Sequence, residues 1–173
     1  MRVVCRYLFV LVLPMLLGLA PQSAKADSHG DATAFMEEYL STFDTGHAGD
    51  IMALYNDPFF MIAPSGDVRA FETKKGIRKA IRGWKFYMKK GGVVSSRYGE
   101  LNVRALSDDT AIASAVVERL DEVGKLLTKI GATYNLRRES GKWKIFIIQL
   151  HDVDTNFSCL VISHDNTKRY IIV

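Results

Sequence analysis

The sequence has few cysteines and prolines, and it lacks the short motifs that mark many enzymes. Cys5 and Cys159 are the only cysteines among 173 residues, and there are four prolines. This cysteine count excludes a disulfide-rich scaffold. No HExxH zinc pair, phosphate-binding P-loop, dinucleotide fingerprint or Gly-x-Ser-x-Gly nucleophile motif occurs. We therefore expect neither a bound metal nor another cofactor.

Long apolar runs are also scarce, and the clearest one lies close to the N-terminus. Tyr7 to Ala20 is apolar, follows the cations Arg2 and Arg6, and precedes the small-x-small site Ala24-Lys25-Ala26. This order is typical of a secretory signal peptide, and the run is shorter than the roughly 20 residues of a membrane span. We predict that residues 1–26 are cleaved and that the protein is exported, periplasmic or secreted, with no stable membrane insertion afterwards. An uncleaved anchor is the alternative.

Removal of this leader changes the charge balance. The chain has 23 Lys and Arg against 19 Asp and Glu, and three of the cations lie in the leader, which leaves 20 against 19. Because the mature protein is nearly neutral and has no recognisable nucleic-acid-binding motif, we expect no nucleic-acid partner. Only Cys159 survives cleavage, so no intramolecular disulfide can form. The remaining residues suit one domain.

The stretch Phe35 to Pro64 predicts two helices that lead into a strand. Helically spaced apolar residues indicate an amphipathic first helix (Phe35, Met36, Tyr39, Leu40 and Phe43). The breaker-rich link Gly46 to Asp50 precedes a second short helix over Ile51 to Tyr55. Asp57-Pro58 then ends that helix before a strand over Phe59 to Ala63.

A third helix follows a short strand over Val68 to Phe71. Thr73 is its expected N-cap, Gly91-Gly92 closes it after Lys90, and its apolar stripe includes Trp84. Its opposite face is cationic. A solvated outer face is the ordinary interpretation, and a surface for an acidic partner or an anionic membrane is the alternative.

From Val93 onward the period changes from helical to alternating. Turn signals separate four runs, which we interpret as an antiparallel meander (94–106, 110–121, 126–138 and 142–151). Gly131 is a candidate bulge that would bend the sheet. In the last run, strict alternation places Trp143, Gln149 and His151 on one face. Residues 152–173 form a C-terminal extension in which we predict an added β-hairpin.

The order of these elements resembles the nuclear transport factor 2-like superfamily, which includes ketosteroid isomerase and the SnoaL-like polyketide cyclases. The features that carry the resemblance are a helix, a Gly-Asp-like link, a short helix ending in an aromatic residue, and an Asp before a strand. The spacing from Tyr39 to Pro64 matches ketosteroid isomerase without a gap. The resemblance implies an α+β cone over residues 27–151, in which a curved antiparallel sheet wraps round a long helix, with a pocket at the wide end.

The resemblance also implies roles for particular residues. Tyr39 matches the tyrosine that donates a hydrogen bond to the developing oxyanion. The general-base aspartate of that enzyme falls on Ala63, whose methyl group cannot accept a proton. The second oxyanion donor falls near Thr133 or Tyr134, where no acid stands. Steroid isomerisation as such is therefore not expected.

Three functions remain open at this point. The first is the binding of a small apolar or oxygenated molecule in the cone, by the expected ligand-binding residues Tyr55, Met61, Ala63, Trp84, Tyr134 and Gln149. The second is a lyase or isomerase that uses Tyr39 with His151 or Glu118 as acid or base. The third is a protein-interaction module. Both faces of the last run are apolar and need cover, which, with the habit of the superfamily, predicts a homodimer.

Overall fold

The structure is a computed structural model that describes residues 27–155. Its helices and strands are α1 (Ser28–Thr45), α2 (Ala48–Ala53), β1 (Tyr55–Ile62), β2 (Val68–Phe71), α3 (Lys74–Lys90), β3 (Ser95–Ala105), β4 (Thr110–Leu120), β5 (Leu126–Glu139), β6 (Lys142–His151) and the 3-10 turn η1 (Val153–Thr155). The predicted signal peptide, and all of the predicted C-terminal extension beyond Thr155, lie outside the described residues.

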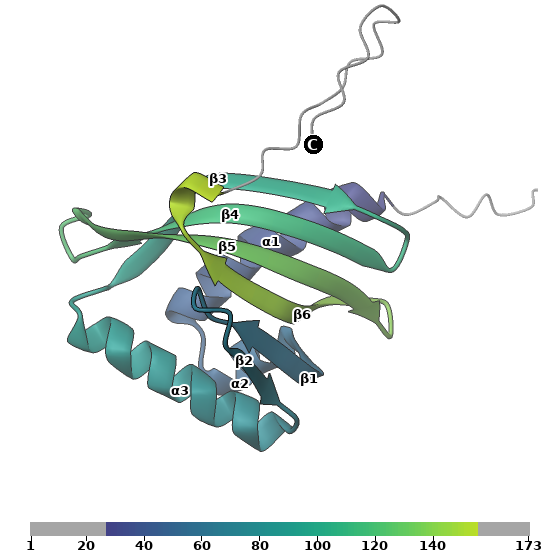
Figure 1. The fold of residues 1–173 in the computed structure, drawn as a ribbon, viewed down its shortest axis with the longest axis horizontal. Helices are drawn as coiled ribbons and strands as arrows, with labels where there is room; N and C mark the ends of the chain where they lie inside the picture. The colour runs from purple at the N-terminus through teal and green to yellow at the C-terminus, as the bar shows by residue number, and fades with distance from the viewer. Residues whose placement is uncertain (1–26, 156–173) are drawn as a thin grey trace, which may run out of the picture.

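Six strands form one curved, open sheet in the order β2-β1-β6-β5-β4-β3. Neighbouring strands are antiparallel except for β1 and β6, which are parallel. Figure 1 shows α1 behind the long strands and α3 along the lower edge of the view, next to the short strands β1 and β2. We call the face that carries α1 the inner face and the opposite face the outer face. This is the α+β cone that the family resemblance implies.

Local capping explains where the two long helices begin. The Asp27 carboxylate accepts the backbone N–H groups of His29 and Gly30, so α1 begins ahead of its apolar stripe. The Thr73 hydroxyl accepts the N–H of Gly76 at 3.2 Å and starts α3 as predicted. The predicted end of α3 at Lys90 is confirmed as well.

The four long strands match the predicted runs to within about one residue at each end, but the first strand differs. The second helix ends at Ala53, and β1 already begins at Tyr55. The Ile145 N–H donates to the Leu54 carbonyl at 2.8 Å, and Tyr55 pairs with Ile145. This pairing with a distant strand overrides the helical pattern around Leu54 and Tyr55.

The predicted bulge at Gly131 is wrong. Gly131 pairs in unbroken register with Val116 on one side and His151 on the other. Its missing side chain makes room for the His151 imidazole, because a Cβ there would lie 2.5 Å from Nδ1. The register shifts instead show one extra residue each at Gly99 in β3, Leu127 in β5 and Phe146 in β6, and β1 is also irregular between Tyr55 and Phe60.

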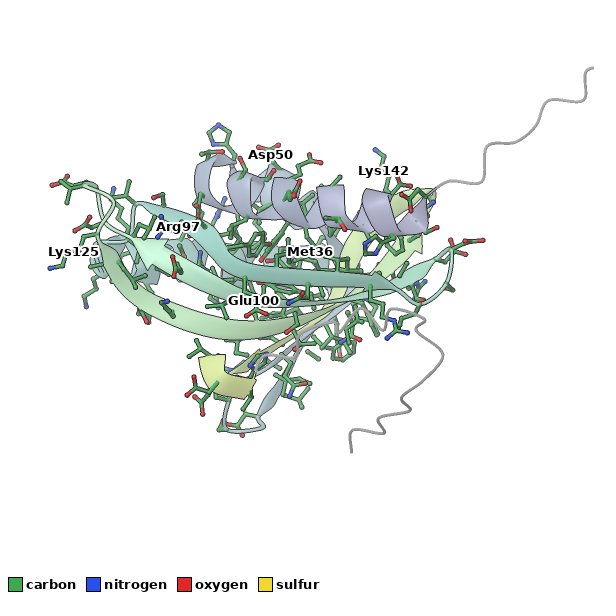
Figure 2. The ribbon with its side chains drawn as sticks, turned by 90° about the horizontal axis from the view of Figure 1, so that it is seen from above. Met36, Asp50, Arg97, Glu100, Lys125 and Lys142 are labelled. Atoms are coloured by element: carbon green, nitrogen blue, oxygen red, sulfur yellow. The ribbon has the colours of Figure 1, made fainter. Side chains whose placement is uncertain are left out.

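The core lies between α1 and the inner face. Met36 of α1 is fully buried there, and Figure 2 labels it between the helix and the sheet. Ala111, Ala113 and Ala115 of β4 are also buried, and their small side chains let the helix approach the sheet closely. None of the described helices is both long enough and apolar enough to cross a membrane.

Polar contacts fix both ends of α1. Arg138 of β5 pairs with Asp31 at 3.0 Å near the first turn of the helix. At the other end, Lys85 of α3 donates from Nζ to the backbone carbonyls of Asp44 and Gly46 at 3.2 and 2.9 Å. A cation at a helix C-terminus also offsets the partial negative charge there. The helix is thereby held in place over the inner face.

Candidate functional site

A cavity of about 370 Å³ lies between the inner face and the helices. The sheet supplies one wall from alternate residues of four strands, namely Met61, Val117, Arg119, Thr128, Ile130, Ala132, Tyr134, Ile148 and Leu150. The other lining residues are largely aromatic and come from the two long helices, from Tyr55 at the start of β1 and from the segment after α3 (Tyr39, Phe43, Trp84, Tyr87, Met88 and Val93). A mostly apolar hollow with a few polar groups is the usual form of a small-molecule site.

Two tyrosine hydroxyl groups meet in this cavity. The Oη atoms of Tyr39 and Tyr55 lie 2.8 Å apart and share a hydrogen bond. Tyr39 comes from α1, one turn before Phe43, and the Tyr134 ring packs edge-on against it with centroids 5.7 Å apart. The pair can offer one hydroxyl proton to an oxygen of a bound molecule.

Burial keeps these hydroxyls in their neutral, proton-donating form. It raises the pKa of Tyr39 well above the ordinary value, and the neighbouring Tyr55 raises it further. The pKa values of Tyr55 and Tyr134 are also raised, again chiefly by burial. At neutral pH these side chains are therefore hydrogen-bond donors and do not act as bases.

Arg119 brings a positive charge to the cavity wall. Its Nη1 donates to the Ser96 hydroxyl and lies 3.9 Å from the Asp44 carboxylate, and its guanidinium lies over the Phe43 ring at 5.6 Å. Asp44 is in turn held by the backbone N–H and hydroxyl of Ser96, at 2.5 and 2.8 Å. The arginine is thus positioned by contacts from α1 and β3.

The structure brings most of the predicted ligand-binding residues together. Tyr55, Met61, Trp84 and Tyr134 all line the cavity, together with Tyr39, which was predicted as a catalytic residue, although 95 residues separate Tyr39 from Tyr134 in the sequence. Ala63 does not line it. It follows β1 in the turn where its N–H bonds to the Asp67 carbonyl.

Gln149 and His151 lie away from the cavity. The expectation that they share a face with Trp143 is wrong, because the extra residue Phe146 reverses the alternation within β6. Beyond that bulge, Ile148 and Leu150 line the cavity. The His151 ring bonds on the outer face to the hydroxyls of two threonines and to the Asp152 carbonyl (Thr133 3.1 Å, Thr155 3.0 Å, Asp152 2.8 Å).

Glu118 also lies on the outer face and not in the cavity. Its carboxylate pairs with Lys129 at 2.9 Å and with Arg97, labelled in Figure 2, at 2.8 Å. These two hydrogen bonds hold its pKa below the ordinary value. The bulged Gly99 leaves room for it, since a Cβ there would meet the carboxylate at 3.1 Å. A role for Glu118 as an acid or base in the cavity does not fit this geometry.

The prediction from sequence missed Arg119, the neighbour of Glu118. A signal was present in β4, where the odd positions 111 to 117 are all apolar while Ser114 and Glu118 occupy even positions. That pattern places position 119 on the inner face. Among the described residues, the cavity lining includes no Asp, Glu or His, and no cluster of three or more potential metal ligands occurs.

Solved structures share this fold at low sequence identity. A putative calcium/calmodulin dependent protein kinase II association domain from Xanthomonas campestris is 19% identical, with a TM-score of 0.54 over 72% of this chain and 86% of that one. An NTF2-like protein with a cystatin-like fold from Novosphingobium aromaticivorans is 17% identical, with a TM-score of 0.57 over 74% and 83%. A ketosteroid isomerase-like protein from Erwinia carotovora atroseptica is 16% identical, with a TM-score of 0.56 over 74% and 98%.

These similarities establish the fold. They do not show the chemistry, which has to be inferred from the residues that line the cavity. None of the curated proteins matches the chain. The model of one family, described as NTF2-like protein (DUF6841), matches residues 28–153 and so spans the long helix, the whole sheet and the cavity. The chain therefore belongs to this NTF2-like family.

Proposed function

We propose that the protein binds a small apolar molecule that carries at least one oxygen atom, in the cavity beneath α1. The observation that carries this proposal is the meeting of the Tyr39 and Tyr55 hydroxyls inside a cavity of about 370 Å³ whose other walls are mainly apolar. The apolar walls favour an apolar body by the hydrophobic effect, and the hydroxyls favour an oxygen acceptor on it.

A thermal-shift screen of the purified protein against steroids, aromatic polyketides and fatty acids tests the proposal. A ligand that binds only the folded state adds about 2.7 kcal/mol at 100 times its dissociation constant. Thr128→Trp places a large ring at the exposed end of the cavity lining and should abolish the shift. Leu127→Trp adds the same ring at the neighbouring exposed residue, which is not part of the lining, and serves as the control. A shift that survives Thr128→Trp would contradict binding in the cavity.

The tyrosine pair supports a second proposal, that the protein is an isomerase or lyase which stabilises a developing oxyanion. Such a reaction needs a base, and in the described part of the chain no carboxylate or imidazole lines the cavity. Ligand binding is therefore the better supported of the two. With a ligand in hand, Tyr39→Phe separates them: loss of a measured turnover with unchanged affinity supports catalysis, and the absence of any turnover in the wild-type protein contradicts it.

We also propose that the protein acts after export. The support comes from the sequence alone, in the basic start, the apolar run and the small-x-small site of residues 1–26. N-terminal sequencing of the protein recovered from its host should begin at Asp27. Recovery of the intact Met1 terminus in the cytoplasmic fraction would contradict export.

A further inference from the structure

Arg119 is the only charged side chain in the cavity lining among the described residues. It pairs across strands with Thr128, which is exposed, whereas Ala132 and Tyr134, further along β5, are buried. The guanidinium therefore lies at the exposed end of a cavity whose far end is closed by apolar and aromatic groups. Its side chain is only 16% exposed.

The contacts of Arg119 with the protein leave part of its bonding capacity unused. A guanidinium has five N–H donors in a planar fork. Within residues 27–155, Nη1 donates to the Ser96 hydroxyl, and the distance of 3.9 Å to Asp44 is too long for a hydrogen bond. Asp44 has its own donors from Ser96. A half-buried guanidinium with free donors can still donate hydrogen bonds to a carboxylate.

The surrounding charges also favour an anion at this end. A second hollow of about 290 Å³ shares Phe43, Met88 and Val93 with the cavity and adds the cations Lys85 and Lys89 to its edge, opposed by Asp44. The field of Arg119 extends inward as well. It opposes the larger effect of burial by lowering the pKa values of Tyr39, Tyr55 and Tyr134.

We infer that the ligands of this cavity are small apolar monocarboxylic acids, which insert their apolar body toward Tyr134 and Ile148 and leave the carboxylate on Arg119. The planar fork of arginine matches a carboxylate in a two-point hydrogen-bonded pair. One guanidinium balances one negative charge, and the nearby Asp44 opposes a dianion. This inference rests on the proposed function, because it names the class of molecule that the same cavity binds.

Matched acids and amides test the inference by isothermal titration calorimetry. The probes are 2-naphthoic acid and decanoic acid, each beside its uncharged amide of nearly the same shape. We expect the wild-type protein to bind at least one acid ten times more tightly than its amide. Arg119→Gln should remove this preference by weakening the acid at least tenfold while it changes the affinity of the amide less than twofold. Arg97→Gln removes an exposed cation of the outer face and should leave the preference intact.

The results distinguish failure of the acid inference alone from failure of the proposed function as well. Equal binding of acid and amide, abolished by Thr128→Trp, supports the cavity as a binding site and overturns the acid inference. Equal weakening of both probes by Arg119→Gln assigns the arginine a structural role and also overturns it. Failure of all four probes and of the thermal-shift screen contradicts the proposed function and the inference together. The comparison of acid with amide in the wild-type protein stands even where Arg119→Gln does not fold.

Discussion

Gly131 shows how one missing side chain shapes the outer face of the sheet. The His151 ring lies over it, and a Cβ at this position would come within 2.5 Å of Nδ1 and 2.7 Å of the Asp152 carbonyl oxygen. One of these neighbours is backbone, so the clash cannot be relieved by rotating the imidazole alone. The residue is required for close approach and not for an unusual backbone angle.

Gly131→Ala should therefore lower the free energy of unfolding by about 1–3 kcal/mol, the usual cost of overpacking. Urea denaturation followed by circular dichroism measures the change. Gly83→Ala is the matched control, because a Cβ there meets nothing within 4 Å and the residue lies inside α3. That change should raise stability by about 0.5–1 kcal/mol. Equal stability of the Gly131 variant and the wild type would refute the close approach.

The buried tyrosines predict a loss of stability in alkaline solution. Burial raises the pKa values of Tyr39, Tyr55 and Tyr134 in the folded state above the ordinary value near 10. Their contribution to the free energy of unfolding is complete below about pH 10. It is lost as the pH rises above that value, because the unfolded chain then releases protons that the folded state retains. Each tyrosine contributes a slope of up to about 1.4 kcal/mol per pH unit.

Thermal melts between pH 8 and pH 11.5 measure this slope. Tyr134→Phe removes one of the buried hydroxyls and should make the alkaline decline less steep. Tyr87→Phe, which takes a hydroxyl from a side chain that is 71% exposed at the rim of the same cavity, is the control and should leave the slope unchanged. A melting temperature that is flat up to pH 11.5 would show that these hydroxyls are not buried in the folded protein.

Among the elements, the basic helix α3 contains one cation, Lys85, with a structural role. Most of its cations are exposed, but Lys85 is half-buried and donates to two carbonyls at the end of α1. Lys85→Met keeps the aliphatic stem and removes these bonds, so it should cost about 1–2 kcal/mol of stability. Lys79→Met, at an exposed position of the same helix, should change stability by less than about 0.5 kcal/mol. Chemical denaturation compares the two, and similar values would contradict the capping role.

The order of the elements could be predicted from the sequence because it depends on local signals. Thr73 as a cap, Gly91-Gly92 as a stop and the turns between the long strands are all contained in short windows. The start of β1 at Tyr55 could not be predicted in this way, because it depends on pairing with Ile145, 90 residues further along.

The aromatic residues of the candidate site could be predicted from the sequence, but its charged residue, Arg119, was not. Tyr39 and Trp84 lie on helices whose inner face is marked by helical spacing, whereas Tyr55 was expected on a helix and lines the cavity from β1. The misplacement of His151 has one cause, the extra residue Phe146, which reverses every later side chain in β6. Arg119 was missed because Glu118 was expected to point into the cavity, and neighbouring residues of a strand point to opposite faces, which would place residue 119 outside it.

At the scale of the whole molecule, the outer face of the sheet has an apolar part and a charged part. Phe60 of β1 and Phe146 of β6 pack edge to face with centroids 5.5 Å apart, beside the half-buried Ile147. Further across the face, Glu118 is surrounded by Arg97 and Lys129. This division indicates that the apolar side chains over β1 and β6 need to be shielded from water, whereas the charged side chains over β3 and β4 do not.

We predict a homodimer that covers the β1–β6 side of the outer face, as both apolar faces of β6 suggested from the sequence. Because burying a carboxylate in an apolar interface is costly, Ile147→Glu should convert the dimer to a monomer. Size-exclusion chromatography with light scattering at micromolar concentration measures the mass. Arg104→Glu introduces the same carboxylate on the outer face of the edge strand β3, and this control should remain a dimer. A monomeric wild-type protein would contradict the prediction, and a dimer that is broken equally by both variants would place the interface across the whole face.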